Sequence, residues 1–228
     1  MSASLELFGA AALAVVGIAV LVVLHLSARN AAARDRDRVF DDVLATVDDP
    51  VVAGRGTGYP ELRGRVGGHP VRLRVVVDAL VLRKLPVLWL EVVVHRNVPV
   101  AGSVSVLMRP HGAEYFSPNA RLEHEPVAPA SFPRPARVAA SGPDAAPALE
   151  LLEPLSDYLG EPETKEVGLG PGGVRAVRLL ASADQGSYRV SRRASFGGVR
   201  VPASELVRTM DVLAAVGDRH HDPTEVTT

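Results

Sequence analysis

The chain has 228 residues, of which 47% are apolar and 4% aromatic, and its 25 basic and 26 acidic residues leave a formal net charge of −1. Cysteine is absent, which excludes disulfide bonds, thiolate metal sites and cysteine nucleophiles. The scarcity of aromatic residues and the lack of a recognisable binding module argue against nucleic acid as a partner.

The first predicted element is a transmembrane helix. No charged residue occurs from Leu7 to Leu24, and nearly every side chain there is apolar. A helix needs roughly 20 apolar residues to cross the hydrocarbon layer of a bilayer, and residues 5–26 meet that length. A cleaved signal is the alternative, but its apolar core would be shorter and a basic segment would precede it. We therefore expect an uncleaved anchor that contacts the lipid bilayer through residues 5–26.

The arginines beside the apolar segment predict its orientation. None precedes it, whereas Arg29, Arg34, Arg36 and Arg38 follow it directly. Basic residues flanking a span favour the cytoplasmic side, so the N-terminus is expected outside and the C-terminal domain in the cytoplasm. Only two of the basic residues are lysine, which we interpret as the coding bias of a GC-rich bacterial genome. The expected location is thus the inner membrane of a bacterial cell, as a single-pass protein.

Residues 29–47 lack glycine and proline and predict a helix that continues from the anchor. Its apolar stripe is expected to dock on the folded domain, and Asp48-Asp49-Pro50 is expected to end it, because the residue before proline is disfavoured in a helix. The stripe consists of Val39, Phe40, Val43, Leu44 and Val47.

Residues 62–77 predict a β-hairpin, since two alternating segments flank Gly67-Gly68, a pair suited to a tight turn. Side chains alternate between the faces of a strand, so four arginines are expected on one side: Arg63, Arg65, Arg72 and Arg74. One interpretation is a solvated outer sheet face. The other is a surface that contacts an anionic lipid or a phosphate-bearing ligand.

The rest of the chain predicts a mixture of strands and helices. Residues 85–94 are typical of a strand buried on both faces, and residues 102–108 of a further strand. A proline-rich connector follows, with a short edge strand at 137–139. Residues 145–159 predict a helix that Pro154 bends or splits into two short turns. Residues 166–180 predict a second hairpin, residues 187–193 a strand and residues 203–216 a helix.

The expected fold class is α+β: one N-terminal transmembrane helix followed by one mainly antiparallel β domain with two or three helices. The predicted boundaries are 1–28 for the anchor, 29–50 for the juxtamembrane helix, 51–217 for the domain and 218–228 for a disordered tail. Within the domain we expect a β-rich part (51–125), a proline-rich connector (126–147) and a helix-hairpin-helix part (148–217).

No motif indicates a catalytic residue, a metal ligand or a cofactor site, and we expect none of these. The sequence favours a non-enzymatic interaction, scaffold or accessory-subunit protein with a membrane or membrane-associated protein as its partner. Recognition of an anionic lipid or phosphate ligand by the four hairpin arginines is the first alternative. An enzyme of unidentified class is the second.

Overall fold

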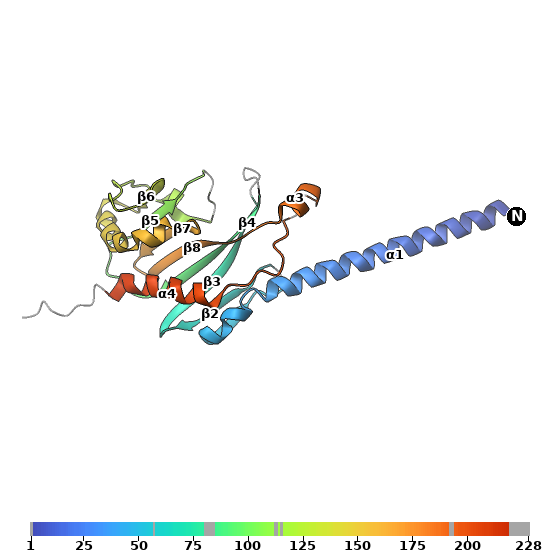
Figure 1. Cartoon of the computed structure of the whole chain (residues 1–228), viewed down its shortest axis with the longest axis horizontal. Helices are drawn as coiled ribbons and strands as arrows, with labels where there is room; N and C mark the ends of the chain where they lie inside the picture. The colour runs from blue at the N-terminus through green and yellow to red at the C-terminus, as the bar shows by residue number, and fades with distance from the viewer. Residues whose placement is uncertain are drawn as a thin grey trace, which may run out of the picture.

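The computed structural model describes residues 2–56, 58–79, 85–111, 114, 116–191 and 194–218. A long helix, α1 (Ser2–Asp37), projects from one end of an α+β body (Figure 1). The body is built on one eight-stranded antiparallel sheet in the order β1-β2-β3-β4-β8-β7-β5-β6. The expected α+β class is therefore found, and residues 219–228 of the predicted tail lie outside the described part.

The sheet consists of two sets of strands, β1 to β4 and β5 to β8, which join where β4 pairs with β8. The strands are β1 (Asp48–Ala53), β2 (Glu61–Val66), β3 (His69–Asp78), β4 (Val87–His95), β5 (Val104–Met108), β6 (Ala136–Ala140), β7 (Thr164–Gly170) and β8 (Gly173–Ser182). The predicted hairpins are confirmed as β2–β3 and β7–β8. Positive φ angles at Gly67 (55°) and Gly68 (81°) make the first turn.

Helices cover one face of the sheet, which we call the covered face. They are the 3₁₀ helices η1 (Asp41–Thr46) and η3 (Pro143–Leu155) and the α-helices α2 (Ser156–Gly160) and α4 (Ala203–Asp218). Contacts of α4 with β4 and β8, and of η3 with β5 and β6, close the apolar core on this side. Leu73, Leu90 and Val106 point into this core and are at most 2% exposed.

The opposite face, which we call the open face, carries the alternate residues of the same strands. Above β5 and β6 it is covered by the 3₁₀ helix η2 (Pro118–Arg121). Towards β2 and β3 it carries the exposed side chains of Arg63, Arg65 and Arg74. One sheet thus has an apolar face under helices and a charged face that is exposed over its first strands.

Helix α1 is long and apolar enough to cross a membrane, and none of the residues in its most apolar stretch is buried against the body. The exposed side chains include Leu13, Ile18 and Leu24, each at least 60% exposed. A buried core helix is therefore excluded as an explanation of this segment. The α-helix ends at Asp37 rather than continuing through Val47. Beyond it, the N–H groups of Arg38 and Val39 donate to carbonyls three residues back, and the Val39 carbonyl accepts a hydrogen bond from the Val201 N–H (2.8 Å).

The predicted docking stripe after the anchor is found, but on a 3₁₀ helix. Val39, Phe40 and Val43 are 0–1% exposed and belong to the main core. The following chain passes so close to β2 that a Cβ at Gly64 would lie 2.3 Å from Val47 Cγ1 and 2.6 Å from the Asp48 carbonyl oxygen. Only glycine fits at this crossing, which joins the anchor to the sheet.

One predicted element is wrong in type. Residues 187–193 were expected as a strand, but helix α3 (Gln185–Ser191) occupies this segment; Arg192 and Arg193 lie outside the described residues. Both sides of β8 are already paired, with β4 and β7, so no neighbouring position is free for a following strand.

The predicted helix at 145–159 is mostly 3₁₀, which agrees with an apolar repeat of three at Leu149, Leu152 and Leu155. Pro147 and Pro154 lack the N–H that an α-helix requires.

Replacing Phe40 by alanine is expected to lower the free energy of unfolding by about 3–5 kcal/mol, because it leaves a cavity where η1 meets the core. The measurement is chemical denaturation of the full-length protein in detergent micelles, followed by the fluorescence of Trp89, the single tryptophan. Val51→Ala, at a side chain that is 61% exposed, is the matched control and should change little. Equal effects of the two substitutions would contradict the docking of η1.

Candidate functional site

The structure brings the four predicted arginines to the open face. Arg63 of β2 lies directly opposite Arg72 of β3, while Arg74 lies opposite Glu61. Arg63 pairs with Glu61, and Arg65 donates to the Gly68 carbonyl near the turn. The side chains of Arg72 and Arg74 instead point towards the next strand, β4, where both contact Glu91. The hairpin therefore divides into an exposed outer pair of arginines and an inner pair that takes part in a larger arrangement.

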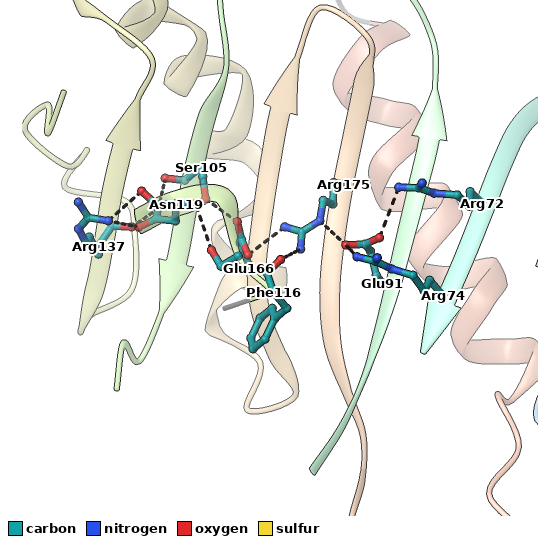
Figure 2. Close-up of polar contacts among 10 residues, drawn as sticks. Arg72, Arg74, Glu91, Ser105, Phe116, Asn119, Arg137, Glu166 and Arg175 are labelled. Atoms are coloured by element: carbon teal, nitrogen blue, oxygen red, sulfur yellow. Dashed lines mark hydrogen bonds and ion pairs between the residues drawn. The ribbon is translucent and has the colours of Figure 1, made fainter. Parts of the chain in front are cut away.

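Glu91 of β4 is the centre of that arrangement. Its carboxylate is buried and lies 3.5 Å from Arg72 Nη2 and 3.1 Å from Arg74 Nη2 on one side. On the other side it accepts a hydrogen bond from Arg175 Nε of β8 at 2.8 Å (Figure 2). Three guanidinium groups therefore surround one carboxylate, which leaves the cluster with surplus positive charge.

Arg175 links Glu91 to a second buried carboxylate, Glu166 of β7. Arg175 Nη1 lies 2.9 Å from Glu166 Oε2, and Nη2 donates to the Phe116 carbonyl at 3.0 Å. Two of the three guanidinium nitrogens thus donate hydrogen bonds, and Nη1 forms an ion pair with Glu166 without hydrogen-bond geometry. Because each contact comes from a different segment, Arg175 fixes β4, β7 and the Phe116 loop relative to one another.

The polar row continues to the far edge of the sheet. Ser105 of β5 donates to Glu166 Oε1 (2.8 Å), and Asn119 of η2 donates to Ser105 Oγ (3.0 Å). Arg137 of β6 then donates to Asn119 Oδ1 (2.7 Å). We call this arrangement the charged row; its members are Arg72, Arg74, Glu91, Arg175, Glu166, Ser105, Asn119 and Arg137 (Figure 2).

Charge pairing shifts the pKa values in the row. Burial alone would raise the pKa of Glu91, but the positive charges of Arg175 and Arg74 outweigh it, so this pKa lies below its usual range. Burial likewise opposes the charged form of Arg175, yet the carboxylates of Glu166 and Glu91 raise its pKa above the ordinary value. Both groups are therefore charged at neutral pH.

A recess of about 410 Å³ opens beside the row on the open face. Arg72, Arg74, Arg121 and Arg175 line it, with Glu91 as the one acidic residue among the described lining residues. Phe116 forms an apolar part of the wall, and its ring stacks at a tilt on Trp89, with the ring centres 5.6 Å apart. The recess thus combines a strongly basic surface with an aromatic ring.

Two further charged clusters have structural partners on every side. Arg178 of β8 contacts Glu161, Glu205 and Thr164 and lies over the Tyr158 ring, joining the sheet to α2 and α4. Buried Lys165 lies 3.0 Å from Glu114 and donates to two backbone carbonyls. These satisfied contacts explain both basic residues as supports of the fold.

Sequence reasoning found only the first two members of the charged row. Glu91 could have indicated the centre of the row, because it is a lone acid within the otherwise apolar segment 85–94. A buried carboxylate nearly always has a charged partner. Arg175 carried no comparable signal, because its role depends on the pairing of β4 with β8. Within the described residues, no group of three or more His, Asp or Glu side chains is placed to hold a metal ion.

Replacing Glu91 by glutamine should lower the free energy of unfolding by about 3 kcal/mol, because it leaves buried Arg175 without one of its two carboxylates. Denaturation of the full-length protein in micelles measures this change. Glu61→Gln is the matched control, since it breaks a more exposed pair with Arg63 and should cost less than about 1 kcal/mol. A loss for Glu91→Gln no larger than for the control would contradict the central role of Glu91.

The stability difference between wild type and Glu91→Gln should depend on pH. The pKa of Glu91 is lowered in the folded state, so its contribution is present above the unfolded pKa of about 4.3. It is lost as the pH falls through the lower folded pKa. The stabilities of wild type and variant should therefore differ by a constant amount above about pH 5 and converge only as the pH falls through the lowered folded pKa. A difference that grows on acidification would contradict this assignment.

Comparison with known proteins assigns the chain to no family. No protein-family model matches it, and neither a curated protein nor a solved structure does. The function therefore has to be inferred from the geometry of the open face and from the position of α1.

Proposed function

We propose that this chain is a single-pass membrane-anchored, non-enzymatic protein whose folded domain acts as an interaction, scaffold or accessory subunit. In this proposal α1 spans the inner membrane with the N-terminus outside, and the domain lies in the cytoplasm. The partner is a membrane or membrane-associated protein that contacts the open face. The observation that carries the proposal is the exposed, arginine-rich part of this face over β2 and β3, beside an anchor-like helix.

The apolar surface of α1 supports the anchor. Its side chains from Leu13 to Leu26 are exposed wherever they are described. Apolar side chains in this number are stable only when something removes them from water, and a bilayer does so on all sides of a helix at once. The arginines that follow the apolar segment favour a cytoplasmic domain.

The join between α1 and the domain supports a defined position near the membrane. The Gly56 N–H donates to Asp37 Oδ1 (2.8 Å), and Arg200 Nη2 lies 3.4 Å from Asp35 Oδ1. Together with the bond between Val39 and Val201, these contacts hold the last turn of α1 from two sides. A partner in the same membrane would therefore meet the open face in a restricted range of orientations.

The position of the hairpin arginines distinguishes a protein partner from the membrane itself. Ala53 pairs with Glu61, so the loop that holds Asp37 lies at the Glu61 end of β2. Arg65 lies four residues further along β2, about 13 Å from that end at 3.3 Å per residue. Arg65 thus lies away from the anchored end, whereas Arg74, opposite Glu61, lies near it. The position of Arg65 favours a partner over the adjacent lipid surface. Recognition of an anionic group remains the second candidate function because of the arginines that line the recess.

The proposed topology predicts protection of the domain from external protease. In intact spheroplasts, added protease should leave the C-terminal domain whole, and it should digest the domain after lysis. The protein should also resist extraction with alkaline carbonate, because α1 is inserted in the bilayer. An epitope at the N-terminus is the internal control and should be removed in intact spheroplasts. Loss of the domain before lysis would reverse the orientation.

A photo-crosslinking residue at position 63 or 65 of the full-length chain should capture the same partner band in cells. Position 150 is the matched control, because Glu150 is exposed but lies on η3 at the covered face. Changing Arg74 to glutamate should weaken both crosslinks, since it reverses the charge of the surface. Bands that form equally from all three positions would contradict binding at the open face.

A further inference from the structure

The recess beside the charged row has more positive charge than its own acids neutralise. Four arginines line it against Glu91, and the only other carboxylate in contact with these arginines, within the described part of the chain, is Glu166 behind Arg175. The cluster therefore has a surplus of two positive charges. Buried or half-buried charges of one sign repel one another, and a bound anion relieves this repulsion.

Three of the four arginines that line the recess have N–H donors without a described partner. Arg72 Nε is buried and has no hydrogen-bond partner among the described residues. Arg74 uses only Nη2, towards Glu91, and its side chain is 45% exposed. Exposed Arg121 makes neither a hydrogen bond nor an ion pair with any described residue. Arginine presents its N–H groups as a planar fork that matches the oxygens of a phosphate.

Arg175 has a different role, because its Nε and Nη2 already donate hydrogen bonds and its Nη1 is paired with Glu166. Its contacts with Glu91, Glu166 and the Phe116 carbonyl fix the back wall of the recess. Glu91 in turn holds Arg72 and Arg74 at one side. The carboxylate thus orients the donors, while the guanidinium groups around it outweigh its charge.

We propose that this recess binds a soluble phosphate monoester. The dianionic phosphoryl group accepts hydrogen bonds from Arg72, Arg74 and Arg121, and the organic part of the ester packs against Phe116. A charge of nearly −2 matches the surplus of the cluster, whereas a carboxylate supplies half of it. This inference rests on the second candidate function, recognition of an anionic group, and names the chemical class of that group.

The test is calorimetric titration of the full-length protein in uncharged detergent micelles with phenyl phosphate, at low ionic strength and above about pH 7, where the phosphate is dianionic. The variant Arg74→Gln/Arg121→Gln should weaken binding by about 10-fold or more, as expected for lost hydrogen bonds between charged groups. Benzoate, with the same ring and one negative charge, should bind more weakly than phenyl phosphate to the wild type.

The matched control is Arg63→Gln/Arg65→Gln, which removes two arginines from the same face but outside the recess. It should weaken the binding of phenyl phosphate less than Arg74→Gln/Arg121→Gln does, because neither side chain lines the recess or can donate to a phosphate bound there. If the double variant Arg74→Gln/Arg121→Gln loses its fold, Arg121→Gln alone replaces it, since this side chain has no described partner to lose.

Three results would overturn the assignment: no heat of binding with phenyl phosphate, equal weakening by both pairs of substitutions, or binding only to vesicles that contain phosphatidic acid. The last result would identify a lipid headgroup as the source of the phosphate. Failure here together with specific crosslinks at positions 63 and 65 would reject the phosphate site and retain the partner surface. Phosphate binding without those crosslinks would retain the phosphate site and reject the partner surface.

Discussion

The contact of Arg175 with Glu91 and Glu166 is the constraint on which the rest of the sheet depends. These residues come from the three central strands β8, β4 and β7, and β8 is the strand that joins the two halves of the sheet. A shift of β8 by one residue would move Arg175 to the covered face, among apolar side chains. The cost of burying an unpaired charge there is large. The ion pairs therefore select one register for the whole eight-stranded sheet.

The same constraint explains how a single sheet can have two such different faces. Along β4, Leu88, Leu90 and Val92 point towards the helices, whereas Trp89 and Glu91 point to the open face. The strand is buried on both sides, but for different reasons. Apolar packing buries the first set, and ion pairs with neighbouring strands bury the second. The charged row thus buries part of the open face through polar and ionic contacts, whereas apolar packing buries the covered face.

The sequence was informative where structure depends on neighbours along the chain. Alternation with a Gly-Gly turn predicted β2 and β3, and with them the common face of Arg72 and Arg74. Periodicity also predicted α4. It could not predict that β8 pairs with β4, since their paired residues are 78 to 95 positions apart in the chain. For that reason Arg175 and Glu166 were missed as site residues, and α3 was expected as a strand. Local pattern does not show that both sides of β8 are occupied.

The close attachment of α1 has a mechanical consequence. From Ile18 to Asp37 the helix contains neither glycine nor proline, and Asp35, Asp37 and Val39 at its end are bonded to the domain. A transmembrane helix inclines by about 20° on average from the bilayer normal. With α1 in a bilayer, such an inclination would rotate the whole body together with the helix. A point in the body about 30 Å from the end of α1 would then move by about 10 Å. The thickness of the surrounding bilayer would then set how far the arginine-bearing surface stands from a neighbouring protein.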